Sequence, residues 1–171
     1  SGIAEIKKIV ADTQNYMLNP SGRTLLFIDE IHRFNKAQQD ALLPHVEDGT
    51  IILIGATTEN PFFEVNKAII SRSTVFQLYP LESKNIKNII INAISDNERG
   101  FGNLNIKIED EALDFIAEAS GGDARIALNA LELAVLTSAG ADSDEIFINL
   151  DTISECVQKK AIKFDKSGEA H

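Results

Sequence analysis

The sequence predicts an α/β fold with parallel strands, followed by an all-α domain. Two short apolar runs, at residues 24–28 and 51–56, show no alternation of polar and apolar side chains, which is typical of strands buried on both faces of a parallel sheet. Segments with helical spacing lie around these runs, and strands that alternate with helices indicate an α/β layer. Beyond Pro80 only helical patterns follow. The predicted domains are 1–80 (the α/β portion), 81–160 (a helical domain) and 161–171 (a linker).

The elements of the α/β portion follow from periodicity and from turn residues. Apolar residues at helical spacing predict an amphipathic helix over residues 3–17. Asn35 is suited to cap a helix that runs through Leu43, where Pro44 bends or restarts it. After the strand at 51–56 we expect a short helix at 66–71 and a third strand at 75–78.

The same signals place the elements of the helical domain. Asp110 and Asp123 are suited to cap helices, and Gly121 with Gly122 supplies the turn between the two middle helices. A short extended piece is expected at 146–148. The helices are predicted at roughly 82–97, 110–119, 123–138 and 150–159, and the polar tail 163–171 is predicted as linker.

Composition limits the class of protein. Of 171 residues, 44% are hydrophobic and 25% are charged, which is ordinary for a soluble domain, and no apolar run approaches the roughly 20 residues that span a bilayer. The single cysteine, Cys156, excludes an internal disulfide framework, suits a reducing cytosol and is predicted to be a small buried side chain. The net charge of −10 opposes binding of nucleic acid by the whole surface, so any such contact is expected to be local or to lie outside this segment.

The strongest candidate site is the end of the first predicted strand, where Asp29 and Glu30 follow four apolar residues. Open α/β sheets bind ligands just beyond the carboxyl ends of their strands, and neighbouring side chains there point in different directions. Asp29 can therefore bind Mg²⁺, directly or through water, while Glu30 polarises a water that attacks the γ-phosphate of a nucleotide. The alternative is that both acids only cap the following turn.

Three further candidates have patterns that are weak on their own. Thr57 and Thr58 follow the second strand, where a hydroxyl can bind the water or the γ-phosphate, or can merely satisfy backbone groups. Arg72 precedes the third strand and can reach a neighbouring subunit's site as an arginine finger, or can form a surface salt bridge. Arg125 lies in the first turn of a helix, where a cation opposes the helix dipole. Either a nucleotide phosphate or a nearby acid such as Asp123 would remove that cost.

The histidines predict no zinc site, because His32, His45 and His171 lack partners at metal-ligand spacing. His32 and Arg33 follow the acidic pair directly, and we interpret them as a relay of the nucleotide state to a neighbour. Mg²⁺ at Asp29 is therefore the metal that the sequence leads us to expect.

Together these motifs resemble the AAA+ ATPases, a class of P-loop nucleoside triphosphatases, and within them the replication-associated recombination protein A family. The resemblance covers nearly the whole chain. Its residues are TLLFIDEIHRFNKAQQDALLPHVEDGTIILIGATTE at 24–59, the NPFFEVN and SRS that follow, GGDARIALNALE at 121–132 and the terminal FDKSGEAH. The implied fold is a truncated P-loop AAA+ core with parallel strands, followed by an all-α helical lid.

The resemblance also implies residue roles, cofactors and partners. It matches Asp29 and Glu30 to the Walker B acids, Thr58 with Thr57 beside it to sensor 1, Arg72 to the arginine finger that acts in trans, and Arg125 to sensor 2. Members of the family are oligomeric, DNA-stimulated ATPases that act at stalled replication forks and are similar to clamp loaders. ATP and Mg²⁺ are therefore the implied cofactors, and fork DNA, further copies of the chain and replication proteins such as the single-stranded-DNA-binding protein are the implied partners. The implied location is cytoplasmic, associated with the bacterial nucleoid, without a membrane partner.

One motif of the family is absent from this sequence. The 171 residues contain no G-x-x-x-x-G-K-[ST] and do not begin with Met; that loop holds the phosphates with its backbone N–H groups and its lysine. We therefore expect a fragment of a longer protein that, by itself, binds ATP poorly and does not hydrolyse it. In the AAA+ topology the strand bearing the loop lies between the strands predicted here at 51–56 and 75–78. We therefore also expect unpaired strand edges, and we expect the chain to self-associate, to exchange a segment or to pack the third strand irregularly.

Two other functions stay open. The protein can be a non-catalytic, clamp-loader-like subunit that donates Arg72 to a neighbour, although the retention of Glu30 and Arg125 favours a hydrolysing one. It can also be a Holliday-junction branch-migration motor, a class that shares FIDEIHR and GATT. The lid segment GDAR and the run NKAQQDALLPHVEDG favour the first family instead.

Overall fold

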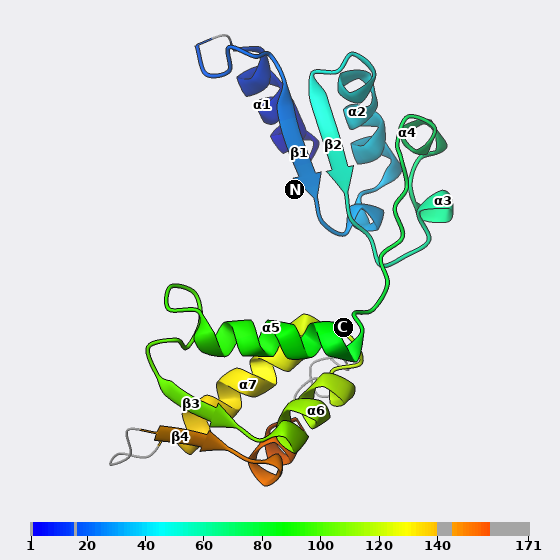
Figure 1. Ribbon diagram of the computed structural model, residues 1–171. Coiled ribbons are helices and arrows are strands. Elements are labelled where there is room, and N and C mark those ends of the chain that lie inside the picture. Colours follow the sequence, from blue (N-terminus) through cyan, green and yellow to red (C-terminus); the bar gives the residue numbers. More distant parts are fainter. Residues whose placement is uncertain (1, 16, 140–144, 158–171) are drawn as a thin grey trace. The chain divides into compact units, whose positions relative to one another are not determined.

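A computed structural model describes residues 2–15, 17–139 and 145–157 of the chain (Figure 1). The chain forms two compact units, Ser1–Gln77 and Leu78–His171, and each is considered by itself. Each unit has a hydrophobic core of its own. Among the described residues, no helix combines the length and the apolar character needed to cross a membrane.

The first unit alternates strands with helices, as predicted (Figure 1). The strand at 24–28 is confirmed, the second strand ends at Gly55, and the first helix ends at Gln14 rather than at residue 17. The short helix expected at 66–71 forms after Asn66, whose side chain caps it. The elements are α1 (Ile3–Gln14), β1 (Thr24–Ile28), η1 (Ile31–Arg33, a 3₁₀ helix), α2 (Lys36–Glu47), β2 (Ile51–Gly55), α3 (Pro61–Glu64) and α4 (Lys67–Ile70).

Helix α2 begins at its predicted cap, Asn35. The Asn35 side chain accepts a hydrogen bond from the N–H of Gln38 at 2.9 Å, and the Gln38 side chain accepts one from the N–H of Asn35 at 2.8 Å. This reciprocal pair is a capping box, which satisfies two N–H groups that the helix itself leaves unpaired. Pro44 lies inside the helix, which continues to Glu47 instead of restarting.

The sheet of the first unit consists of β1 and β2, paired in parallel from Thr24 opposite Ile51 to Ile28 opposite Gly55. Side chains of one face of this sheet meet those of the helices in a common core, because alternate residues of a strand point to the same side. The buried members of this core are Ile6, Val10, Ile28, Ile31, Leu42, Ile51, Val65 and Ile69.

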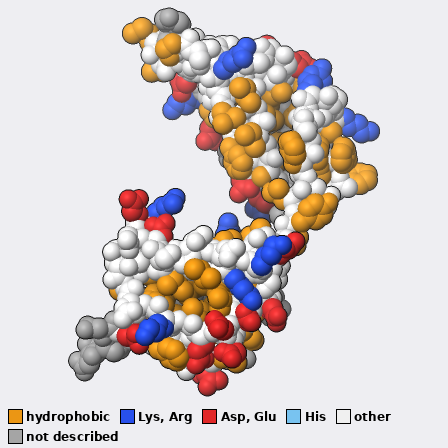
Figure 2. All heavy atoms as spheres, in the orientation of Figure 1, with side chains coloured by type: hydrophobic (Ala, Val, Ile, Leu, Met, Phe, Trp, Pro, Cys, Tyr) orange, Lys and Arg blue, Asp and Glu red, His pale blue; other side chains and the backbone are white. Residues whose placement is uncertain are grey.

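The opposite face of this sheet is open. The exposed fractions are 62% for Leu25, 61% for Phe27, 50% for Ile52 and 45% for Ile54, and we call these four residues the open face. Figure 2 shows hydrophobic side chains gathered over this part of the first unit. Burial of both strands on two faces, predicted from their continuous apolar runs, is therefore wrong for this chain, because its described elements leave the second face to solvent.

The third strand predicted at 75–78 does not form. Residues 74–82 have no regular secondary structure, and β1 and β2 alone make up the described sheet of this unit. A strand needs a neighbour for its N–H and C=O groups. The apolar side chains of Val75, Phe76 and Leu78 are exposed. The β propensity of these residues was not sufficient to form a strand without a strand to pair with.

The second unit is mostly helical, as predicted, but it also contains a two-stranded parallel sheet. Asn105 to Ile108 pair with Glu145 to Ile148. The extended piece expected at 146–148 is therefore a strand, but its partner was not predicted. The prediction of an all-α unit is wrong for this reason. The missed strand, N-I-K-I, is short, and its distant partner decides its conformation. The elements are α5 (Ser83–Ser95), β3 (Asn105–Ile108), α6 (Asp110–Ala119), α7 (Ala124–Ser138), β4 (Glu145–Ile148) and a helical segment at 150–157.

The turn before α7 forms as predicted. The carboxylate of Asp123 accepts the N–H groups of Arg125 at 2.7 Å and Ile126 at 3.3 Å. Gly121 and Gly122 have φ angles of +57° and +82°, a backbone region that residues with a Cβ rarely adopt. A Cβ on Gly122 would also lie 2.6 Å from the carbonyl oxygen of Leu81.

Two further predictions concern the ends of helices in this unit. Asp110 is not a cap, because Glu109 holds the N-cap position and Asp110 is the first helical residue, where a carboxylate favourably opposes the helix dipole. Cys156 is buried in the core of the unit, as predicted. The linker at 161–171 and His171 lie outside the described residues.

Candidate functional site

The end of β1 is tied to the end of β2 by backbone hydrogen bonds. The N–H of Ala56 donates to the carbonyl of Ile28 at 2.9 Å, and the N–H of Ile31 donates to the carbonyl of Ala56 at 3.0 Å. Because Ile31 is also buried, it anchors the turn that carries Asp29 and Glu30. The two carboxylates therefore lie at the carboxyl edge of the sheet, where parallel α/β folds bind ligands.

Glu30 has a left-handed backbone conformation, with φ 53° and ψ 46°. Among the described residues it is the one non-glycine residue with positive φ. This conformation costs an L-residue roughly 1–2 kcal/mol, and such strain is concentrated at functional sites. The turn is tightened by Asp29, whose Oδ1 accepts the N–H of Glu30 at 3.1 Å.

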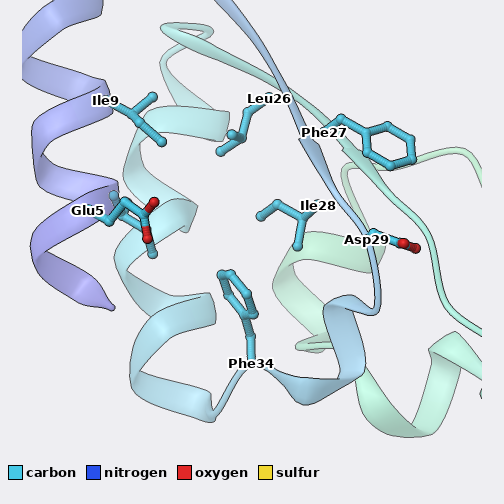
Figure 3. Close-up of a pocket in the computed structure, with 8 residues that line it drawn as sticks. Glu5, Ile9, Leu26, Phe27, Ile28, Asp29 and Phe34 are labelled. Carbon is cyan, nitrogen blue, oxygen red and sulfur yellow. The ribbon is translucent and has the colours of Figure 1, made fainter. Parts of the chain in front are cut away.

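Asp29 is exposed, and it adjoins a pocket of about 240 Å³ between α1 and β1. Figure 3 shows Ile9, Leu26 and Phe34 turned toward this space, whereas the side chains of Phe27 and Asp29 point away from it. The pocket is therefore lined mainly by apolar groups and is unsuited to phosphates. Asp29 is instead directed to the side of the strand that carries the open face.

Glu30 does not stand alone: its carboxylate is linked to the end of β2 through His32. Glu30 Oε2 lies 3.2 Å from His32 Nε2, and His32 Nδ1 lies 2.7 Å from the hydroxyl of Thr57. Arg33 is the second partner of Glu30, with Nε at 3.8 Å from Oε2. From the sequence, Glu30 and Thr57 were separate candidates, and the contact of His32 with both of them was not predicted. His32 itself had been noted, but as a relay to a neighbouring subunit.

Thr57 and Thr58 differ in what they bind. Thr57 contacts His32 and also accepts the N–H of Glu59 at 3.0 Å. Thr58 is exposed, and its hydroxyl forms no hydrogen bond within the described part of the chain. Of the two hydroxyls at this strand end, the one on Thr58 is thus available to an external ligand.

Arg72 is not brought to this site within the first unit. Its Nη2 lies 2.7 Å from Glu47 Oε1, and its Nη1 donates to the carbonyl of Ala68 at 3.0 Å and to the hydroxyl of Ser71 at 3.2 Å. The surface salt bridge left open from the sequence is therefore present. Half-exposed pairs of this kind stabilise a protein by at most about 1 kcal/mol, so they do not prevent the guanidinium from turning to another partner.

Arg125 belongs to the second unit, in the first turn of α7. Its side chain is exposed and forms no ion pair with any described residue of the chain. Asp123 binds its backbone N–H instead. Within the described structure, no acidic side chain therefore offsets the unfavourable position of the Arg125 cation at the positive end of the helix dipole.

The residues at the end of β1 fit a bound Mg²⁺–nucleotide. The second carboxylate oxygen of Asp29 has no partner among the described residues, and oxygen is the ligand atom that Mg²⁺ prefers. Groups of three or more metal-binding side chains are absent from the described residues. A magnesium ion here would thus be coordinated mostly by water and phosphate oxygens, as is common for Mg²⁺ bound with a nucleotide.

Comparison with known proteins agrees with the motifs and the fold. The family described as "ATPase family associated with various cellular activities (AAA)" matches residues 2–81, and the "AAA C-terminal domain" matches residues 102–171. Replication-associated recombination protein A of Bacillus subtilis (strain 168) is 49% identical over 151 residues, which are 88% of this chain and 36% of that protein. The protein of the same name from Escherichia coli (strain K12) is 43% identical over 169 residues, 99% of this chain and 38% of that protein.

Solved structures give the same fold. A Thermotoga maritima RuvB variant matches with a TM-score of 0.60 and 27% identity, over 88% of this chain and 49% of that one. The FIGL-1 AAA domain in complex with ADP also has a TM-score of 0.60, over 90% of this chain and 56% of that one, but at 19% identity it supports the fold alone. The chain spans 36% to 38% of the length of the two curated relatives. From its motifs, its fold and these relatives, the chain belongs to the AAA+ ATPases, in the family of replication-associated recombination protein A.

Proposed function

We propose that this chain supplies the water-activating and metal-binding half of an ATP-hydrolysing site in a longer AAA+ ATPase. One observation carries the proposal: Asp29 and Glu30 leave β1 at the same sheet edge where Thr57 and Thr58 leave β2, and two backbone hydrogen bonds lock these strand ends together. Carboxylates and hydroxyls at adjacent strand ends suit a bound triphosphate and its attacking water.

The proposed roles follow from where each group lies. Asp29 would hold Mg²⁺, directly or through water, and the ion would neutralise charge on the triphosphate when bound. Glu30 orients and deprotonates the attacking water, and Thr58, whose hydroxyl is exposed, binds that water or the γ-phosphate, with Thr57 beside it. Arg72 acts on the site of a neighbouring subunit, and Arg125 binds phosphate from the lid, where an anion would balance its unfavourable place on the helix dipole.

The names of the relatives point to replication and recombination. We propose that the longer protein is a homo-oligomer in the bacterial cytoplasm, associated with the nucleoid, that couples ATP hydrolysis to work on fork DNA alongside replication proteins such as the single-stranded-DNA-binding protein. The net charge of −10 opposes a general affinity of this chain for DNA. DNA is therefore bound by local contacts or by residues outside this segment.

The isolated chain is proposed to be inactive. Its 171 residues contain no G-x-x-x-x-G-K-[ST] loop, and without that loop the phosphates lack their main backbone and lysine donors. Calorimetric titration of the chain with Mg-ATP should give no measurable binding in the micromolar range. A micromolar Kd would overturn this part of the proposal.

The role of Glu30 is tested in the longer protein with Glu30→Gln, which keeps the shape of the side chain and removes its charge. Nucleotide binding should be retained, and DNA-stimulated turnover should fall by about 10²–10⁴-fold, the usual contribution of a general base. Glu111→Gln, at an exposed position in the first turn of α6, is the matched control and should leave turnover unchanged. Wild-type turnover in Glu30→Gln would refute the assignment.

Assays of the longer protein also distinguish the two alternative functions from the first proposal. A non-catalytic subunit would show no turnover of its own but would lose stimulation of a neighbour's site when Arg72 is replaced. A branch-migration motor, favoured by the similarity to RuvB, would unwind four-way junctions in an ATP-dependent assay. Turnover that depends on Glu30 without junction unwinding supports the first proposal over both.

A further inference from the structure

His32 connects two groups that the proposed function treats separately. It lies in η1 between the strand ends, with Nε2 at 3.2 Å from the Glu30 carboxylate and Nδ1 at 2.7 Å from the Thr57 hydroxyl. Its side chain is only 17% exposed, against 35% for Glu30 and 78% for Arg33. A ring held at both nitrogens and largely shielded from water has little freedom to rotate.

With Glu30 ionised and His32 neutral, the hydrogen-bonding capacities of the three side chains fix the positions of the protons. An ionised carboxylate only accepts hydrogen bonds, so His32 Nε2 must be the donor to Glu30. A neutral imidazole that donates at Nε2 must accept at Nδ1, which makes the Thr57 hydroxyl the donor there. The N–H of Glu59 takes one of the two acceptor positions of the Thr57 oxygen at 3.0 Å, and the hydroxyl proton is available to His32.

This chain of contacts affects Glu30 more than its other neighbour does. Arg33 lies 3.8 Å from the carboxylate on a mostly exposed side chain, a geometry in which an ion pair contributes little. The Glu30 backbone is left-handed, so the side chain leaves the strand end in a direction that few residues adopt. Contact with the shielded His32 ring is therefore what selects one carboxylate orientation.

We infer that His32 is a positioning residue: it fixes the carboxylate of Glu30 and makes its orientation depend on the hydroxyl of Thr57. The inference rests on the proposed function for its catalytic consequence. Without the Thr57 hydroxyl the His32 ring loses its partner at Nδ1, and the donor to the Glu30 carboxylate is no longer held in one place.

The hydrogen-bond assignment is tested without nucleotide. In the ¹⁵N-labelled chain at about pH 8, where imidazole is neutral, long-range ¹H–¹⁵N spectra should give the tautomer of His32 as Nε2–H; the chain has three histidines, and His32→Asn identifies the signal. Thr57→Val should mix the tautomers and Thr57→Ser should preserve the wild-type spectrum. An Nδ1–H tautomer, or a spectrum unaffected by Thr57→Val, overturns the inference.

The catalytic consequence is tested in the longer protein with three substitutions that separate the two contacts. Gln at position 32 can still donate toward Glu30, Asn retains reach only toward Thr57, and Ala loses both. His32→Ala and His32→Asn should lower kcat by about ten- to a hundredfold, as expected for a misplaced catalytic group, without raising the KM for ATP. His32→Gln should recover most of the lost kcat. A general folding defect would lower all three alike and change KM, which is contrary to the inference.

The two possible failures are distinguishable. If Glu30→Gln abolishes turnover while His32→Ala and His32→Asn keep the wild-type kcat, the inference fails and the proposed function stands. If Glu30→Gln leaves turnover intact, the proposed function fails. The His32 tautomer then tests the structural part of the inference by itself.

Discussion

Glu30 combines two properties at one residue: a carboxylate at the site and a backbone conformation that glycine adopts at lower cost. If the sequence served stability alone, glycine would be the better choice at this position. The presence of Glu therefore fits a residue kept for chemistry at some expense in stability, a common trade at functional sites.

The first prediction separates the backbone from the carboxylate. Glu30→Gly should be more stable than Glu30→Ala by about 1 kcal/mol, because glycine tolerates the left-handed conformation and alanine does not. Chemical denaturation of the chain measures the difference. Since both variants lack the carboxylate, the comparison does not depend on the His32 contact, and an alanine variant as stable as the glycine variant would contradict the strain.

Several side chains of the candidate site could be located from the sequence by their place at strand ends. Asp29, Glu30 and Thr57 could be predicted there because an apolar run implies a buried strand and the residue after it implies the sheet edge. The His32 bridge could not, since it depends on the 3₁₀ turn that folds Ile31–Arg33 back and on the register that sets Ile28 opposite Gly55. A histidine two residues after a strand-end Glu, with a Thr at the next strand end, is the signal that could have suggested it.

Helices and strands could be predicted best where the residues that decide them are close together in the sequence. Asn35 and Gln38 form a capping box over three positions, and Asp123 caps α7 over two. Two of the errors involve partners far away: 75–78 lacked a strand to pair with, and Asn105–Ile108 acquired one in Glu145–Ile148. Pairing between distant segments, which no local pattern encodes, decided both.

The second prediction concerns the start of α2. Asn35→Ala should destabilise the first unit by about 1 kcal/mol, because it removes the oxygen that accepts the N–H of Gln38. Lys36→Ala, next to it at an exposed position with no cap contact, should cost much less. Thermal unfolding of both variants measures the difference, and equal midpoints would speak against a stabilising role of the cap.

The third prediction concerns the open face of β1 and β2. Four large apolar side chains at 45% to 62% exposure, beside a strand edge that no other described strand pairs with, favour association. Sedimentation of the chain should therefore show a weight-average mass that rises with concentration. Phe27→Gln and Ile52→Gln should reduce that rise, because they lower the apolar area of the face.

Met17→Gln provides the control for this experiment. Met17 is 89% exposed but lies outside the sheet, so its replacement should leave the mass unchanged. A chain that stays monomeric at all concentrations, with amides at 51–56 and 75–78 equally protected from exchange, would show that the open face and the strand edge do not drive association.

At the scale of the whole molecule, the chain consists of two units, Ser1–Gln77 and Leu78–His171, each with its own core. The residues between β2 and α5 include an irregular segment at 74–82 in which Phe76, Leu78 and Tyr79 are exposed. Segments of this kind, with exposed side chains and no ladder hydrogen bonds, are the preferred sites of proteolysis.

The fourth prediction follows from this segment. Chymotrypsin, which cleaves after aromatic and leucine residues, should cut first within 74–82 and release two fragments that resist further digestion. Replacing Phe76, Leu78 and Tyr79 by Ser should slow the first cut, whereas Phe115→Leu, in helix α6, should not. Mass spectrometry of the products identifies the site, and first cuts inside the helices would refute the division.

The pairing of β3 with β4 has a consequence for how the chain folds during its synthesis on the ribosome. A parallel pair closes only when its later member has been synthesised, and here β3, α6 and α7 are all made before Glu145–Ile148 emerges. Until then Ile106 and Ile108 have no neighbouring strand, and the buried positions of α7 lack part of their cover. The two described strands of the first unit have both been made once Gly55 is synthesised, so they can pair much earlier. The nascent second unit is therefore the part that most needs protection by chaperones during translation.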